Sequence, residues 1–67
     1  MKPEQLSDET LFDVTLSALT EIAERIAAQE VAATLADDSL HATRAKWGRQ
    51  DALSIISNVI ALKGRCL

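Results

Sequence analysis

Few residues of this chain have the chemistry that a catalytic or metal site requires. The sequence contains one cysteine, Cys66, and one histidine, His41, which are too few ligands for a structural zinc site. Ser39 is close to His41, but no recognisable arrangement of carboxylate and nucleophile surrounds the imidazole. The carboxylates Glu21 and Glu24 lack the histidine that completes a di-iron motif. We therefore expect no catalysis, no metal ion and no cofactor.

A basic cluster surrounds the single tryptophan and is the strongest candidate for a partner-binding site. Trp47 stands among Arg44, Lys46 and Arg49, and tryptophan and arginine dominate the hot spots of protein interfaces. The bases could meet an acidic protein surface or an RNA backbone, or they could pair with acids of this chain. Trp47 is either an interface anchor or a residue packed over the loop end. The acids available for pairing are Glu30, Asp37 and Asp38.

The residues before this cluster are typical of a long amphipathic helix. Ser7 is a suitable N-cap for a helix over about residues 8–36. After Ile26 the apolar pattern changes, because Gln29 and Glu30 fall where the apolar face should continue. Either the helix bends there, or its last turns meet a different partner. The main apolar face recurs at spacings of three and four residues and contains Phe12, Leu16, Leu19, Ile22, Ala23 and Ile26.

A short polar link predicts an antiparallel hairpin. The link is the segment 37–39, and a second helix is expected over about residues 40–63, with Gly64 just beyond its end. Gly48 either lies inside this helix or separates a short helix at 39–47 from the rest. We expect one all-α domain over residues 1–67, with loose termini at 1–6 and 65–67.

The apolar face of the second helix is too wide for one neighbouring helix. Ile56 lies at its centre, and the face covers roughly half of the helix circumference. We therefore expect a homodimer in which two hairpins form a four-helix bundle. The residues expected to carry self-association are Phe12, Leu16, Leu19, Leu53, Ile55, Ile56, Val59, Ile60 and Leu62.

The charges of the two halves are opposite. Residues 1–38 carry two bases against nine acids, a net −7, and residues 39–67 carry five bases against one acid, a net +4. Halves of opposite sign favour packing against each other, within one chain or between chains. In a hairpin, Lys63 and Arg65 would lie near Asp8 and Asp13, and Arg44 and Lys46 would lie near Glu30. The acidic total weighs against general nucleic-acid affinity.

The N-terminal segment and the cysteine content are typical of a cytoplasmic protein. No apolar run reaches the roughly 18 residues of a membrane span, and the first residues lack the apolar core of a signal peptide. A lone cysteine suits a reducing compartment. We expect a cytoplasmic protein that makes no membrane contact.

Two resemblances suggest what such a hairpin binds. The stretch 47–50, Trp-Gly-Arg-Gln, together with the size and hairpin plan, resembles the small co-chaperones of type III secretion needle subunits. In plan, a dimeric hairpin is also similar to the plasmid copy-number regulator Rop, which implies RNA binding through Arg44, Lys46 and Arg49. The hypothesis that we carry forward is a small bacterial or phage protein–protein interaction module of the regulator, inhibitor or co-chaperone type.

Overall fold

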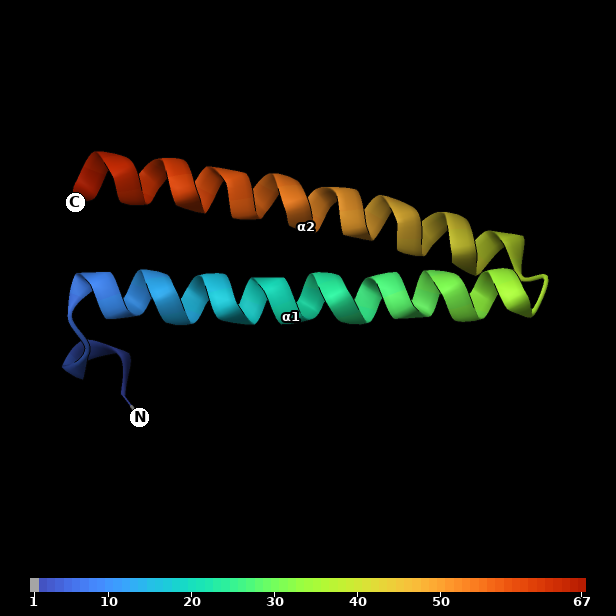
Figure 1. Cartoon of the computed structure of the whole chain (residues 1–67), viewed down its shortest axis with the longest axis horizontal. Helices are drawn as coiled ribbons and strands as arrows, with labels where there is room; N and C mark the ends of the chain where they lie inside the picture. The colour runs from blue at the N-terminus through green and yellow to red at the C-terminus, as the bar shows by residue number, and fades with distance from the viewer. Residues whose placement is uncertain (1) are drawn as a thin grey trace.

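The computed structural model describes residues 2–67 and shows two long helices packed side by side in an antiparallel hairpin (Figure 1). A short 3-10 helix, η1 (Pro3–Gln5), precedes α1 (Asp8–Leu35) and α2 (Ser39–Cys66), and the described residues contain no strand. The molecule is long and thin, at 45 × 25 × 12 Å. The predicted all-α hairpin is therefore confirmed. Met1, which belongs to the segment expected to be loose, lies outside the described residues.

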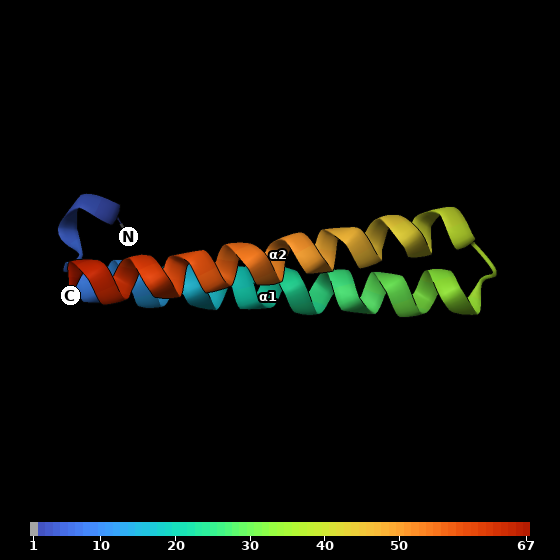
Figure 2. The same cartoon turned by 90° about the horizontal axis from the view of Figure 1, so that it is seen from above.

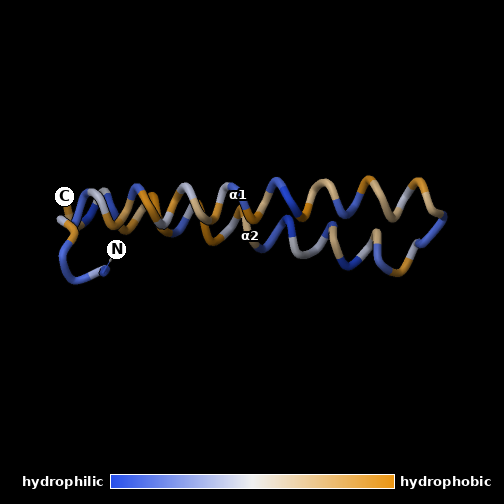
Figure 3. Tube along the Cα trace, turned by 90° about the horizontal axis from the view of Figure 1, so that it is seen from below, coloured by the Kyte–Doolittle hydropathy of each residue, from blue (hydrophilic) through white to orange (hydrophobic). Residues whose placement is uncertain are grey.

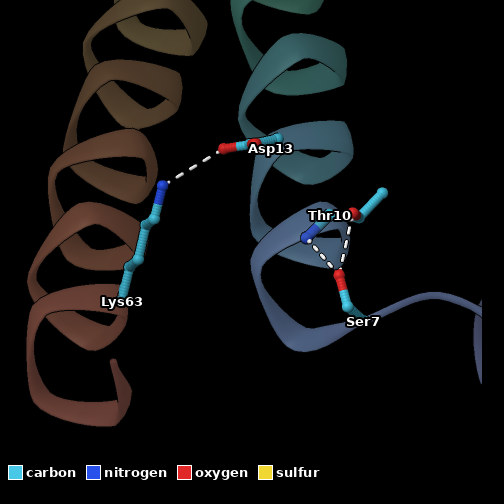
Figure 4. Close-up of polar contacts among 4 residues, drawn as sticks. All are labelled: Ser7, Thr10, Asp13 and Lys63. Carbon is cyan, nitrogen blue, oxygen red and sulfur yellow. Dashed lines mark hydrogen bonds and ion pairs between the residues drawn. The ribbon is translucent and has the colours of Figure 1, made fainter.

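Side chains at the start of each helix satisfy free backbone donors. The Ser7 hydroxyl accepts a hydrogen bond from the Thr10 backbone N–H at 3.2 Å, as predicted for an N-cap (Figure 4). The Asp38 carboxylate accepts one from the His41 N–H at 3.2 Å and so caps α2. Both caps lie at element boundaries that the polar residues had indicated.

The connection between the helices is a tight helix ending. Asp37 adopts the left-handed conformation, with φ 57°, which is uncommon for a residue other than glycine. Its N–H donates to the carbonyl of Thr34 at 3.2 Å, and the Asp38 N–H donates to that of Ala33 at 2.9 Å. This pair of bonds satisfies carbonyls at the end of α1 and reverses the chain within three residues.

The second helix differs from its prediction at two glycines. It passes through Gly48 without interruption, so the alternative of a separate helix at 39–47 is wrong. It also continues past Gly64 to Cys66, and the predicted end at Lys63 is wrong as well. The Leu67 N–H still donates to the Lys63 carbonyl at 2.9 Å. A helical glycine costs only about 1 kcal/mol, which is too little to end a helix whose hydrogen bonds continue.

The two helices meet along a seam with a seven-residue repeat. Alternating spacings of three and four are typical of coiled-coil packing, and Figure 2 shows α2 crossing over α1 at a small angle. The only buried hydrophobic residues among those described are Ala23, 9% exposed, and Ala52, 6% exposed. The seam contains Phe12, Leu16, Leu19, Ala23, Ile26, Glu30 and Ala33 of α1 and Ala42, Ala45, Arg49, Ala52, Ile56, Val59 and Lys63 of α2.

Charged residues occupy both ends of this seam. Lys63 Nζ lies 3.1 Å from Asp13 Oδ1, which confirms the expected proximity of these two residues (Figure 4). Near the loop, Glu30 Oε2 lies 3.1 Å from Arg49 Nε. Of the bases near Trp47 that could pair with acids of this chain, Arg49 is thus the one that pairs with Glu30. Glu30 therefore continues the seam although the apolar pattern changes after Ile26, and the alternative of a different partner for these last turns stays a prediction.

Candidate interaction surfaces

A groove opens between the two helices near the chain termini. It has a volume of about 450 Å³ and lies where the N-terminal turns of α1 meet the C-terminal turns of α2. Most of its lining is apolar, with carboxyl, hydroxyl and thiol groups at the rim. The lining residues are Asp8, Leu11, Phe12, Thr15, Val59, Leu62 and Cys66.

The apolar lining of this groove continues toward the middle of the hairpin. Ile22 follows Thr15 by seven residues and Ile55 precedes Leu62 by seven, so each lies on the same side of its helix as a groove residue. Ile22 and Ile55 are each 48% exposed. We call this surface the groove face, and it consists of Leu11, Phe12, Thr15, Ile22, Ile55, Val59 and Leu62.

Toward the loop, the same side of the hairpin carries polar side chains beside small apolar residues. A second hollow there contains Gln29, His41 and Arg44 beside Ile26, Ala45 and Gly48. Gln29 follows Ile22 by seven residues, and Gly48 precedes Ile55 by seven, which places the hollow in line with the groove face. The large exposed aliphatic residues of this side therefore extend from the termini to the middle of the hairpin.

The opposite side of the seam is apolar on α2 near the termini and on α1 near the loop, where Ala27 and Val31, seven residues after Thr20 and Glu24, line another hollow. Leu53 and Ile60, seven residues apart on α2, are both exposed, and Ile60 lies one turn before Lys63, which pairs across this side with Asp13. Near the termini, the α1 part of this side is a shallow hollow whose lining is about half polar and half apolar. Its residues are Asp13, Leu16, Ser17, Thr20, Glu21 and Glu24. We call this surface the opposite flank.

The residues predicted for self-association thus occupy three places. Phe12, Leu16, Leu19, Ile56 and Val59 lie in the seam and stay partly exposed there. Ile55 and Leu62 lie on the groove face, and Leu53 and Ile60 lie on the opposite flank. Sequence reasoning missed Leu11 and Ile22 as members of the groove face. The sequence did contain a signal for Ile22. It lies seven residues after Thr15, just as Leu62 lies seven residues after Ile55, and this spacing places each pair on one side of its helix.

Trp47 lies on the outer side of α2, away from the seam. Its side chain is 61% exposed, so the alternative in which it packs over the loop end is wrong for the single hairpin. Leu40, seven residues earlier, is 58% exposed and lies on the same side of the helix. We call Leu40 and Trp47 the outer stripe. An exposed indole next to an exposed leucine is a candidate contact for another protein.

The bases near Trp47 do not form one surface. Arg44 lines the hollow next to Gln29, whereas Arg49 lines a different hollow next to Val31 and Thr34. Arg49 also pairs with Glu30, and its side chain is only 38% exposed. Lys46 is exposed. The structure therefore separates the three bases that the sequence grouped together.

The cap of α2 is also its main electrostatic feature. The His41 backbone N–H, and then its ring, hydrogen-bond to the Asp38 carboxylate and lower the pKa of that group below its ordinary value of 3.8. The ring Nδ1 lies 2.5 Å from Asp38 Oδ2. This contact engages the single histidine in capping the helix.

Hydrophilic and hydrophobic positions alternate along both helices (Figure 3). No helix in the described part of the chain is long and apolar enough to cross a membrane. Among residues 2–67, no three side chains of histidine, cysteine, aspartate or glutamate come together in a group that could hold a metal ion. The chain matches no protein-family model, no curated protein and no solved structure.

Proposed function

We propose that this chain is a small protein–protein interaction module without catalysis of its own, and that its first partner is a second copy of itself. The observation that carries this proposal is the size of its surface. The single hairpin exposes 5118 Å², whereas a compact monomer of its 7.3 kDa mass would expose about 4,200 Å². The excess of roughly 900 Å² is close to the 800 Å² or so that each partner buries in a standard interface.

The composition of this surface supports the same proposal. Among the described residues no large side chain is fully buried, and the exposed set includes six isoleucine or leucine residues in the helix interiors. A domain of this size needs a core, staples or a partner to fold stably. Pairing two hairpins into a four-helix bundle would supply the core that one hairpin lacks. The large exposed aliphatic residues of these interiors are Val14, Ile22, Val31, Leu40, Leu53, Ile55, Ile60 and Leu62.

The outer stripe is the proposed site for a second kind of partner. Leu40 and Trp47 lie opposite the seam, so they remain outside a bundle that forms around the seam and its flanks. Arg44 and Lys46 are exposed near Trp47 and would favour an acidic protein surface. In this arrangement self-association supplies stability, and Trp47 supplies recognition, as expected of a regulator, inhibitor or co-chaperone.

The alternative of RNA binding receives less support. It requires Arg44, Lys46 and Arg49 to act together, but Arg49 is paired with Glu30 and borders a different hollow from Arg44. The net charge of −3 also opposes a phosphate backbone. We therefore favour a protein partner.

Self-association is tested by co-purification of two differently labelled copies. An affinity-tagged copy and an untagged copy are expressed together, and the tagged copy is captured and washed. With equal expression we expect the untagged chain to be retained at about half the amount of the tagged chain, because random pairing also forms tagged homodimers. A washed sample that contains the tagged copy alone would contradict the proposal. Mixing the two copies only after lysis, at high dilution, controls for capture by the resin.

A further inference from the structure

We infer that the two hairpins of the dimer pack groove face on groove face about a twofold axis parallel to the helices. In this arrangement α1 of each copy lies against α2 of the other, and both loops lie at the same end. The inference rests on the proposed self-association and adds its geometry. Three observations support it: the distribution of apolar residues, the net charges of the two helices, and one pair of oppositely charged residues that lie at the same level along the helix axes.

The groove face is the better surface for a symmetric contact. It has exposed or half-buried apolar residues on both helices, such as Leu11 and Ile22 of α1 and Ile55 and Leu62 of α2. The opposite flank offers Leu53 and Ile60 on α2, but beside them α1 presents Ser17, Thr20 and Glu24, and its exposed Val31 lies farther toward the loop. Packing two opposite flanks would take these hydroxyls and the Glu24 carboxylate out of water, which is costly. Packing two groove faces buries mainly carbon.

Two symmetric arrangements then remain, because a twofold axis must lie in the plane of the interface. An axis parallel to the helices places α1 on α2 of the other copy. An axis perpendicular to the helices places α1 on α1 and α2 on α2. Facing helices run antiparallel in both arrangements, so helix dipoles do not distinguish them. The two arrangements therefore differ in which side chains they bring together.

Net charge favours the parallel axis. Residues 1–38, which contain α1, carry −7, and residues 39–67, which contain α2, carry +4. With the parallel axis the acidic half of each chain faces the basic half of the other, and Asp13, Glu21 and Glu24, which lie on the opposite flank, contribute at long range. With the perpendicular axis, acidic helices face each other and basic helices face each other, which opposes association.

A specific pair of residues at the rim of the groove face favours the same axis. Asp13 pairs with Lys63, and the helices are antiparallel. Arg25, twelve residues after Asp13, is therefore level with Asp51, twelve residues before Lys63. Arg25 is fourteen residues after Leu11, which lines the groove, and Asp51 is seven residues after Arg44, which lines the neighbouring hollow. Residues seven or fourteen apart lie on the same side of a helix. Both Arg25 and Asp51 therefore lie at the outer rims of the groove face.

The parallel axis brings these two rims together. The rim of α1 then meets the rim of α2 from the other copy at equal height, so that Arg25 faces Asp51 of the second copy twice in the dimer. Within the hairpin, Arg25 pairs only along its own helix with the exposed Glu21 at 3.0 Å, and the ion pairs of the described residues do not include Asp51. Asp51 is thus free to make the contact.

The uneven apolar distribution leads to the same arrangement. Leu11, Ile22, Ile55 and Leu62 lie between the termini and the middle of the hairpin, and the loop part of this side carries polar side chains beside small residues. A parallel axis superimposes the two apolar halves in full. A perpendicular axis through the middle of the hairpin would set each apolar half against a polar one.

Spin labels measure which ends of the two hairpins come together. One label is placed on the native Cys66, and another on Ala36→Cys in a Cys66→Ser background. With the parallel axis, both label pairs should be separated by less than about 25 Å, given helix spacings of about 10 Å. With the perpendicular axis the loop labels should be about 40 Å apart or more, the length of a 28-residue helix. A long loop-to-loop distance in a confirmed dimer overturns the arrangement alone, whereas a monomer overturns the self-association too.

Charge exchange at the rim tests the contact itself. We expect Arg25→Asp and Asp51→Arg to weaken dimerisation by about three- to tenfold each, since exposed charge pairs contribute modestly. The double variant should restore the wild-type dissociation constant. The matched control is Glu21→Gln, which removes the partner of Arg25 within the chain and should leave dimerisation unweakened. Weakening that the double variant fails to reverse would overturn the inferred pairing.

Discussion

Glu30 and Arg49 form an ion pair across the seam, at positions where a coiled coil usually carries apolar side chains. Arg49 Nε lies 3.1 Å from Glu30 Oε2, and the side chains are 38% and 25% exposed. Each residue occupies its place in the seven-residue repeat of its helix. A polar pair at such positions fixes the register of the helices at some expense in stability. We attribute the alignment of the loop half of the hairpin to this pair.

Removing one partner of this ion pair should destabilise the protein more than replacing both partners by leucine. Arg49→Ala leaves a partly buried carboxylate without its partner, and we expect the free energy of unfolding to fall by about 1–2 kcal/mol. Replacing both Glu30 and Arg49 by leucine should be neutral or stabilising. Urea denaturation at one fixed protein concentration measures both effects. An unchanged midpoint for Arg49→Ala would show that the pair contributes nothing.

The capping carboxylate of Asp38 should make stability depend on pH in the acid range. Hydrogen bonds from His41 lower the folded-state pKa of Asp38 below 3.8. The stabilisation is therefore fully present above the unfolded-state pKa of about 4 and is lost as the pH falls through the lowered folded-state pKa. Asp38→Asn keeps a capping oxygen but does not titrate. The thermal midpoint of the wild type should fall relative to this variant on acidification, and parallel pH profiles would contradict the assignment.

The two sides of the seam should respond differently to a buried charge. Ile55 on the groove face and Ile60 on the opposite flank are 48% and 56% exposed in the hairpin, so neither Ile55→Glu nor Ile60→Glu should unfold it. Ile55→Glu should weaken dimerisation tenfold or more, because about 1.5–3 kcal/mol of apolar burial is lost per side chain. Ile60→Glu is the matched control. Light scattering across a dilution series compares them, and a larger effect of Ile60→Glu would assign the interface to the other side.

Trp47 should matter for recognition and not for stability. Its side chain is exposed on the outer stripe, and surface substitutions of this kind usually change stability by less than about 0.5 kcal/mol. We expect Trp47→Ala to keep its helicity and its dimer and to lose a protein partner that the wild type captures from the native host. A cooperative unfolding transition at a clearly lower temperature in the variant would instead assign Trp47 a structural role.

The fold was predictable where local signals were strong. The Ser7 cap, the apolar spacing from Phe12 to Ile26 and the polar link at 37–39 predict both helices and their antiparallel order. The end of α2 was not predictable, since Gly64 is a stop signal only when backbone hydrogen bonding does not continue beyond it. Glu30 was missed as a seam residue because hydrophobic periodicity does not register a charge that is neutralised by the facing helix.

The candidate surfaces were predictable only in part. The width of the apolar face around Ile56 indicated surplus apolar surface, and the structure shows such surface on both sides of the seam. Which residues share a side depends on how the second helix lies against the first, and this cannot be read from one helix alone. Proximity in sequence likewise grouped Arg44 with Arg49, although the helix turns them toward different hollows.

The molar mass of the wild-type chain in solution tests the central claim most directly. Sedimentation equilibrium at tens of micromolar should give twice the 7.3 kDa mass of the chain, because the single hairpin leaves Ile22, Ile55 and Leu62 exposed. Dilution should shift the mass toward the monomer and lower the thermal midpoint in parallel. A folded species of 7.3 kDa at every concentration would contradict the account.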